Sequence, residues 1–350
     1  MLKNSTDMEN FLSYELAPYP ASLFQEGLMR KTQKSVLGTL LKSKVGANSI
    51  IPDNSIFVID GGCLLHTVIW PVKSTYKEVC ETYASYTEKQ YGVGSTIVFD
   101  GYRSQTSTKV AEQQRRETKS ISKDILFDMD MKTMTSQAAF LTNNANKARL
   151  IDMLSHELEY RGMKIKQAES DADYLIVSTS LSLAESQSRP VVVAGTDIDL
   201  LVMLISQAQD NMKVHMMVQH NPVCVYDVIQ IQNTIGNVKD NLMFIHAATG
   251  CDTVSCMCGL GKKKAFDIVS SGTELPNLKV LTNRNSTHDE IETVGEMFLL
   301  RLYGAKKVES LDRYRYVTYN RMMSRLSLSS TFILEALPPT SAAAKRCNND

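Results

Sequence analysis

Seven aspartates stand where short apolar runs end or where helices are expected to begin. The runs Ile56–Asp60 and Thr96–Asp100 each end in an aspartate that a glycine follows, and Asp197 and Asp199 follow the run that starts at Pro190. Gathering many carboxylates in one place is electrostatically unfavourable unless protons or cations compensate. Oxygen ligands favour hard cations such as Mg²⁺ or Mn²⁺, and two such ions can clamp the attacking and leaving oxygens of a phosphodiester. The full set is Asp60, Asp100, Asp171, Asp173, Asp197, Asp199 and Asp252.

Each of these aspartates alone has an ordinary structural explanation. Aspartate before glycine is common in turns, and aspartate at the start of a helix is a common N-cap. As a set they are harder to explain without cations. No Ser-His-Asp or Cys-His arrangement competes, because the six histidines lie outside recognisable catalytic contexts. The chemistry that the sequence predicts is therefore metal-assisted hydrolysis of a phosphodiester.

Apolar runs and helix-like segments alternate through the first two thirds of the chain. We expect strands at 56–60, 96–100, 163–166 and 190–194, and helices at 74–91, at 146–161 and from residue 171. Such alternation predicts an α/β domain with a mostly parallel sheet, and continuous Val/Ile runs suit strands that are covered on both faces. Ligands of open α/β sheets bind beyond the carboxyl ends of the strands, so this sheet would bring distant aspartates to one edge.

The chain divides by pattern into four segments. Residues 1–54 are expected to form an N-terminal extension, residues 55–236 the α/β core, residues 237–335 a mostly helical region and residues 336–350 a tail. Apolar residues recur at helical spacing within the basic segment 29–44, which predicts an amphipathic helix there.

The composition is that of an ordinary globular protein. Lys+Arg and Asp+Glu both number 38, which gives a formal net charge of zero, and 43% of the residues are hydrophobic. Zero net charge excludes a protein that coats nucleic acid by bulk charge, but it leaves room for opposed local fields. The seven cysteines show neither a disulfide framework nor a usual zinc spacing. No signal peptide and no run of roughly 20 apolar residues is recognisable, so we expect an intracellular protein without a membrane partner.

Five segments resemble, in order, the motifs of the flap endonuclease group of 5′ nucleases within the PIN-like superfamily. Phe57-Val-Ile-Asp60 and Val98-Phe-Asp-Gly101 are similar to the family's first two strand motifs. Ser170-Asp-Ala-Asp173 resembles its S-E-A-E motif with both glutamates replaced by aspartate, and Gly195-Thr-Asp-Ile-Asp199 resembles its T-x-D-x-D type element. The stretch from Gly250 to Ala265 is similar, gap for gap, to its G-S-D-x₆-G-I-G-x-K-x-A segment.

This resemblance implies a PIN-like, flap-endonuclease-type fold: a mostly parallel sheet flanked by helices, followed by a helical region with a helix-two-turn-helix. It also implies that all seven aspartates bind two Mg²⁺ or Mn²⁺ ions and that Asp197 is a catalytic residue. The side chains of Asp171 and Asp173 are about one methylene shorter than the family's glutamates, which is the main departure of this chain from the metal-binding pattern.

Basic residues complete the site that the resemblance implies. Lys109 and Arg116 lie seven residues apart, on one face of an expected helix, where they would steer the scissile phosphate and stabilise its developing charge. Lys123 extends that stripe; taken alone, the stripe would also fit a solvated helix. His66, six residues after Asp60, stands where the family has an aromatic on which a base stacks, and a position in the core is its alternative.

A second contact with nucleic acid is implied at Gly259-Leu-Gly261, which looks like the turn of the helix-two-turn-helix. Glycines there let the backbone approach a phosphate, and the start of the next helix favours an anion. The family often holds a monovalent cation at this turn, so K⁺ is expected at Gly259 and Gly261, with Lys262, Lys263 and Lys264 binding the nucleic acid. An ordinary turn with surface lysines is the alternative.

We therefore predict a metal-dependent, structure-specific nuclease that cuts DNA at a flap, a junction or a 5′ end by a two-metal mechanism, in the nucleus. Two alternatives keep the same fold: a catalytically inactive scaffold that binds nucleic acid, and a PIN-type nuclease that acts on RNA. A phosphatase with an aspartate nucleophile would need an acid two residues after Asp60, where Gly62 stands.

Overall fold

The computed structural model describes residues 5–46, 48–101, 123–219, 223–272, 275–305, 310–326 and 332–347. The chain forms two compact units. We call Leu41–Thr234 the sheet unit, and Met1–Leu40 together with Ile235–Asp350 the helical unit. Among the helices of the described ranges, none has both the length and the apolar character that crossing a bilayer requires.

The sheet unit contains a six-stranded sheet in the order β5-β4-β3-β6-β7-β8. Its strands are β3 (Ile56–Asp60), β4 (Thr96–Phe99), β5 (Lys164–Gln167), β6 (Val191–Ala194), β7 (Val214–Val218) and β8 (Cys224–Asp227). All pairs are parallel except β7 with β8, which is antiparallel. The predicted α/β core with a mostly parallel sheet is confirmed, whereas β7 and β8 are strands that the sequence patterns did not predict.

The strand register explains why aspartates that are distant in sequence meet. Asp60 pairs with Val98 on β4, and Ile59 pairs with Ala194 on β6. The three central strands therefore end at the same edge of the sheet, and the residues that follow them project from that edge. All four residues of β6 are buried, as expected for a strand that is covered on both faces.

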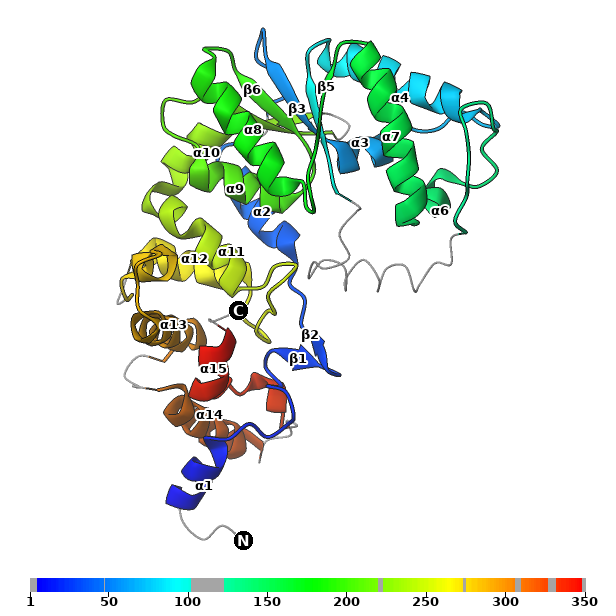
Figure 1. Ribbon diagram of the computed structural model, residues 1–350. Coiled ribbons are helices and arrows are strands. Elements are labelled where there is room, and N and C mark those ends of the chain that lie inside the picture. The colour runs from blue at the N-terminus through cyan, green and yellow to red at the C-terminus, as the bar shows by residue number, and fades with distance from the viewer. Residues whose placement is uncertain are drawn as a thin grey trace. The chain divides into compact units, whose positions relative to one another are not determined.

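Helices cover both faces of this sheet (Figure 1). On one side lie α8 (Asp173–Ser186) and α9 (Ile198–Gln207), and on the other lie α4 (Tyr76–Tyr91) and α7 (Asn144–Tyr160). The short helix α3 (Gly61–Thr67) precedes α4 in the sequence, α6 (Gln137–Leu141) precedes α7, and α10 (Val228–Ile235) follows β8. These bounds agree with the helices predicted at 74–91, at 146–161 and after residue 171.

Local sequence signals account for the start of several of these helices. Thr75 and Glu78 form a capping box at α4, in which each side chain accepts the other residue's backbone N–H. Asn143 caps α7 by accepting the N–H of Asn146. At the start of α4, the ring of Tyr76 stacks on that of Phe127 with centroids 4.0 Å apart, so residues that follow segment 102–122 pack against the same core.

The helical unit joins the two ends of the chain. Its elements are α1 (Ser5–Leu12), β1 (Phe24–Gln25), β2 (Leu28–Met29), the 3₁₀ helices η1 (Gly236–Asn241), η2 (Leu278–Thr282) and η3 (Leu334–Ala336), α11 (Leu242–Ala248), α12 (Lys262–Ser271), α13 (His288–Tyr303), α14 (Leu311–Leu326) and α15 (Ser341–Cys347). The amphipathic helix expected within 29–44 is α2 (Lys34–Ser43), which spans the boundary between the units. The predicted helical region after residue 236 is confirmed.

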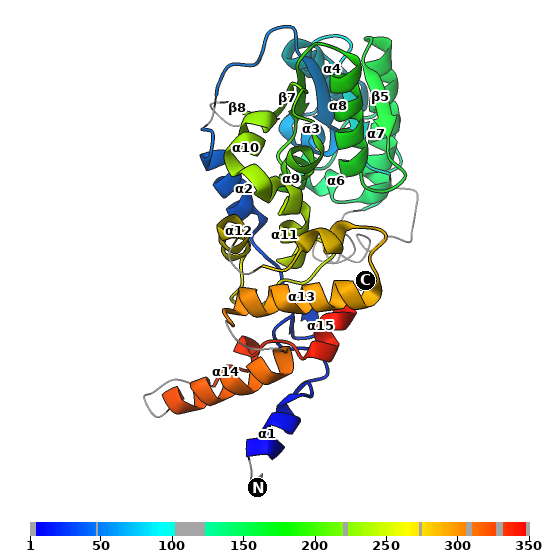
Figure 2. The ribbon, with the colours of Figure 1, turned by 90° about the vertical axis from the view of Figure 1, so that its left-hand side faces the viewer.

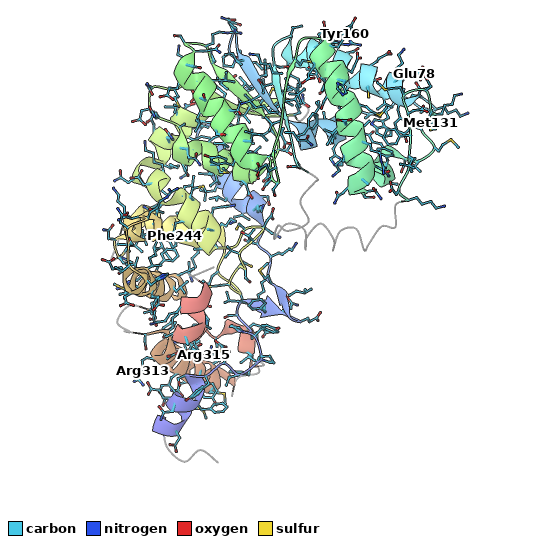
Figure 3. All side chains as sticks on the ribbon, in the orientation of Figure 1. Glu78, Met131, Tyr160, Phe244, Arg313 and Arg315 are labelled. Carbon is cyan, nitrogen blue, oxygen red and sulfur yellow. The ribbon has the colours of Figure 1, made fainter. Side chains whose placement is uncertain are left out.

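Buried Arg315 on α14 ties the N-terminal segment to the C-terminal one (Figure 3). Its guanidinium donates to the carbonyls of Leu12 at 2.9 Å and Tyr14 at 3.3 Å, and also to that of Pro338. Within 336–350, for which the sequence predicts a tail, α15 lies beside α13 (Figure 2), and the Nζ atom of Lys345 is 2.8 Å from a carboxylate oxygen of Glu292.

Candidate metal centre

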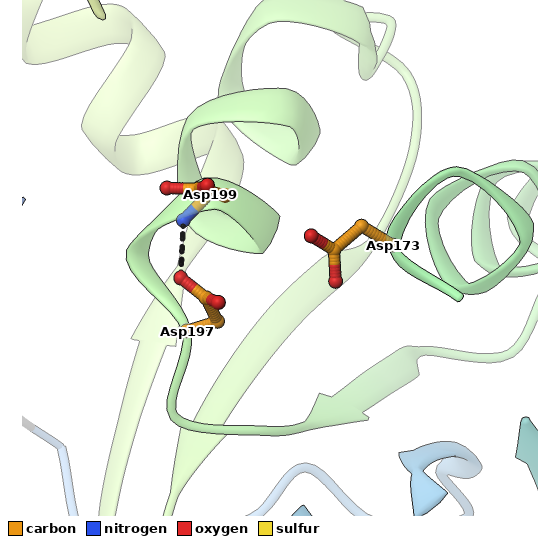
Figure 4. A group of neighbouring side chains, drawn as sticks. All are labelled: Asp173, Asp197 and Asp199. Carbon is orange, nitrogen blue, oxygen red and sulfur yellow. Dashed lines mark hydrogen bonds between the residues drawn. The ribbon is translucent and has the colours of Figure 1, made fainter. Parts of the chain in front are cut away.

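Three carboxylates converge at the edge of the sheet where its parallel strands end. Asp173, Asp197 and Asp199 each offer an oxygen, and these three oxygens lie within 4.8 Å of one another (Figure 4). Asp173 is the first residue of α8, and Asp199 lies in the first turn of α9. Asp197 is the N-cap of α9, and its Oδ1 accepts the backbone N–H of Asp199 at 3.0 Å. The N-terminal ends of α8 and α9 therefore position the three carboxylates.

Asp60 belongs to the same acidic region. It ends β3 and caps α3, where its Oδ1 accepts the N–H of Cys63 at 3.1 Å. Burial, together with the negative charges of Asp100 and Asp197, raises the pKa of Asp60 to about 6, against the opposing hydrogen bond from the backbone of Cys63. Burial is the largest cause of this shift, and a bound cation would offset the part that comes from the neighbouring carboxylates.

Asp100 and Asp171 hold the segment that carries Asp173. The Oδ1 of Asp100 accepts the N–H of Ala172 at 3.0 Å, and the Oδ1 of Asp171 accepts that of Asp173 at 3.4 Å. Gly101 completes the attachment, because its N–H donates to the carbonyl of Ser170 at 2.7 Å. The start of α8 is thus fixed to the end of β4, although the two are far apart in sequence.

Two glycines leave the space that these carboxylates occupy. A Cβ atom at Gly62 would lie 3.2 Å from Oδ1 of Asp60 and 3.9 Å from Oδ2 of Asp100. A Cβ atom at Gly195 would lie 3.4 Å from Cβ of Asp60 and 3.7 Å from its Oδ2. Both positions therefore adjoin the acidic side chains. The role of Gly62 beside these carboxylates was not predicted from the sequence.

The residues fit a hard divalent cation. The converging donors are carboxylate oxygens, which Mg²⁺ and Mn²⁺ prefer. Two oxygens on one Mg²⁺ can be at most about 4.2 Å apart at its usual bond lengths. The 4.8 Å limit of the cluster of Asp173, Asp197 and Asp199 is therefore within a few tenths of an ångström of what one ion requires. A glycine-lined space at Asp60 and a raised pKa there agree with this fit.

The remaining predicted acid, Asp252, lies in the helical unit. Its Oδ1 is 2.9 Å from the Nζ atom of Lys34, and both residues are partly accessible to solvent. Its assignment as a metal ligand stays a prediction.

The residues predicted to bind nucleic acid near the acidic cluster lie in different environments. Lys109 and Arg116 lie outside the described residues. Lys123 has an exposed side chain, and its carbonyl accepts a hydrogen bond from Nδ2 of Asn146 at 2.9 Å. His66 lies on α3 and is exposed, so the core position does not apply. Partial desolvation and then the charge of Lys147 lower the pKa of His66.

The turn between α11 and α12 corrects one prediction. Gly259 has a φ of +72°, which favours glycine, and a Cβ atom at Gly259 or Gly261 would meet open space. Lys263 and Lys264 are exposed. Lys262, in contrast, is 1% exposed, so the expectation that it binds nucleic acid is wrong for this structure. Its ammonium is turned inward and bonded to backbone carbonyls.

No protein-family model matches the sequence, and no curated protein is significantly similar to it. Among solved structures, the chain is similar to the catalytic core of Rad2 in complex with DNA substrate, with a TM-score of 0.45 and 12% identity over 89% of this chain and 84% of that chain. It is also similar to human GEN1 in complex with Holliday junction DNA, with a TM-score of 0.43 and 15% identity over 82% of this chain and 73% of that chain. A third similar structure is flap endonuclease-1 from Methanococcus jannaschii, with a TM-score of 0.40 and 15% identity over 87% of this chain and 96% of that chain.

Proposed function

We propose that this protein is a Mg²⁺- or Mn²⁺-dependent nuclease that hydrolyses phosphodiester bonds in DNA at a flap, a junction or a 5′ end. The observation that carries the proposal is the convergence of Asp173, Asp197 and Asp199, with Asp60 beside them, at the carboxyl edge of the sheet. A catalytically inactive scaffold would have no need for a cluster whose carboxylates raise the pKa of a neighbour, because that repulsion costs stability.

The proposed roles follow from position. Asp60, Asp173, Asp197 and Asp199 would hold the cations, while Asp100 and Asp171 would orient the start of α8 through their bonds to its backbone and also offer ligand oxygens. Bound divalent ions offset the charge of a phosphate and make a water molecule more acidic at neutral pH. Lys109 and Arg116 would stabilise negative charge that develops on the phosphate. His66 would stack on a base.

The test is a cleavage assay with a matched pair of variants. Labelled single-stranded, duplex, flap and hairpin DNAs and RNAs are incubated with the protein and Mg²⁺, Mn²⁺ or EDTA. Asp197→Asn keeps an N-cap at α9, since asparagine caps helices as well as aspartate, but removes a charge from the cluster. Asp152→Asn is the control, because Asp152 is an exposed carboxylate on α7 of the same unit.

We expect cleavage of a DNA substrate with metal and none in EDTA. Asp197→Asn should lower the rate by roughly a hundredfold or more, because losing a residue that only supports a ligand already costs 10- to 100-fold. Asp152→Asn should cut like the wild type. The proposal is wrong if no substrate is cut, or if Asp197→Asn cuts as fast as Asp152→Asn. Cleavage of RNA but not of DNA would show that the protein is an RNA nuclease. Metal-independent binding without cleavage would support the alternative of an inactive scaffold that binds nucleic acid.

A further inference from the structure

Three consecutive lysines, Lys262, Lys263 and Lys264, begin α12, yet they differ sharply in exposure. Lys263 and Lys264 are exposed, whereas only 1% of Lys262 is accessible. The Nζ atom of Lys262 lies 2.9 Å from the carbonyl oxygen of His246 and 2.6 Å from that of Gly250. The hydroxyl of Thr249 is a third acceptor at 3.4 Å.

A buried ammonium is costly unless hydrogen bonds replace its water. Here the acceptors come from the last turn of α11 and from the residues just after it, where carbonyls lack helical partners and a cation interacts well with the helix dipole. Because Lys262 is itself the first residue of α12, one side chain connects the end of α11 to the start of α12. It therefore closes the loop formed by residues 249–261.

The same loop is held from its other side by the N-terminal segment. The N–H of Cys258 donates to the carbonyl of Ser22 at 2.8 Å, and the N–H of Cys256 donates to that of Arg30 at 2.9 Å. In return, the N–H of Arg30 donates to the hydroxyl of Ser255 at 3.1 Å. The loop is consequently fixed between a buried lysine and a separate stretch of chain.

We propose that Lys262 is a positioning residue: it fixes the loop 249–261 so that its exposed neighbours, Lys263 and Lys264, meet the phosphate backbone of a nucleic-acid duplex. This inference rests on the proposed function, because it requires that the protein binds nucleic acid. Within this run of three lysines, Lys262 shapes the surface, whereas Lys263 and Lys264 contact the nucleic acid.

The salt dependence of binding separates these two roles. A lysine that contacts a phosphate releases a counterion, so its removal lowers the slope of log K against log salt by about 0.9. A lysine that only shapes the loop weakens binding and leaves that slope unchanged. Lys262→Met removes the ammonium and keeps an unbranched side chain, and Lys263→Met is the matched variant one residue away.

The experiment measures the affinity of a labelled DNA duplex by fluorescence anisotropy in EDTA at several salt concentrations, together with backbone hydrogen exchange. For Lys262→Met we expect binding roughly fivefold or more weaker, an unchanged slope, and faster exchange across residues 246–261. For Lys263→Met we expect weaker binding, a slope reduced by about 0.9 and wild-type exchange. If Lys262→Met does not fold, Ser255→Ala loosens the loop from its other side and must show weaker binding with an unchanged slope.

The inference is overturned if Lys262→Met reduces the salt slope as Lys263→Met does, or if it leaves both the affinity and the exchange at wild-type values. Binding in EDTA does not depend on cleavage, so a protein that binds duplex but cuts nothing would refute the nuclease and leave the role of Lys262 standing. A wild-type protein that binds no duplex would refute both, even if exchange in Lys262→Met were faster.

Discussion

Replacing Asp60 with asparagine is expected to make the metal-free protein more stable while weakening its hold on divalent metal. Burial and the neighbouring charges of Asp100 and Asp197 raise the pKa of Asp60 from 3.8 to about 6. Each pKa unit corresponds to about 1.4 kcal/mol, so ionised Asp60 costs the folded state roughly 3 kcal/mol. Asparagine carries no charge, and its side-chain oxygen can still accept the N–H of Cys63.

The sign of the pH dependence follows from the same shift. A carboxyl that ionises less readily when folded binds its proton more tightly in the folded state. This group therefore has no effect on wild-type stability below about pH 4, lowers the free energy of unfolding as the pH rises from about 4 to 6, and lowers it by the full amount at pH 8. The gain from Asp60→Asn should accordingly appear at pH 8 and vanish near pH 4.

The assay is thermal and urea unfolding in EDTA, followed by the fluorescence of Trp70. It is the single tryptophan of the chain, it is 8% exposed, and it lies in the sheet unit, so its signal reports the unfolding of that unit. For a unit of this size, roughly 3 kcal/mol corresponds to a rise in Tm of about 6–12 °C. Asp152→Asn, on an exposed surface, should stay within about 0.5 kcal/mol of the wild type.

A metal titration completes the test. Added Mn²⁺ should raise the Tm of the wild type by mass action and should raise that of Asp60→Asn much less, because the variant has lost a ligand. An Asp60→Asn variant that is no more stable than the wild type at pH 8 in EDTA, or that is equally stabilised at pH 4, would contradict this prediction.

Three further substitutions test the supports of the site. Gly62→Ala places a Cβ atom 3.2 Å from Oδ1 of Asp60, so Mn²⁺ affinity, measured by titration calorimetry, should fall about tenfold with stability nearly unchanged; an unaltered affinity would contradict the role of that glycine. Tyr83→Phe removes a buried hydroxyl that accepts from Nε1 of Trp70 at 3.0 Å and donates to the carbonyl of Leu65 at 2.7 Å. The free energy of unfolding in urea should fall by about 1–3 kcal/mol, and a loss below about 0.5 kcal/mol would show that neither bond contributes to stability. Asn146→Ala removes bonds of 2.8 Å to the N–H of Ile125 and 2.9 Å to the carbonyl of Lys123, so hydrogen exchange at residues 123–125 should quicken, and protection equal to the wild type would count against this anchor.

The central strands were predictable because their signal is local. Continuous apolar runs bounded by polar residues and glycine define β3, β4 and β6 in the sequence, and the aspartates after them share an edge because parallel strands must align. Strand β7 was not predicted because His215 interrupts its apolar pattern, and β8 (Cys224–Asp227) was not predicted because it is short and mixed in polarity. Such strands form through pairing with neighbours, which a local pattern does not reveal.

What could be predicted about the functional residues from the sequence was limited in a similar way. That Asp173, Asp197 and Asp199 share one edge of the sheet could be expected, because each follows or begins an element at the carboxyl ends of parallel strands. The burial of Lys262 could not, since nothing in a run of three lysines distinguishes the one that carbonyls of α11 will surround. Likewise, the space that Gly62 leaves beside Asp60 depends on the path of two strands.

The union of both chain ends in the helical unit imposes an order on biosynthesis. Arg315 donates to the carbonyl of Leu12, from which 303 residues separate it. At translation rates of 5–20 residues per second, the first helix waits roughly 15 to 60 seconds for that partner. The contiguous sheet unit can close during the wait, since all its strands precede residue 235. The helical unit is therefore completed after the sheet unit, and a substitution near Leu12 would disturb the packing of Arg315, which is translated much later.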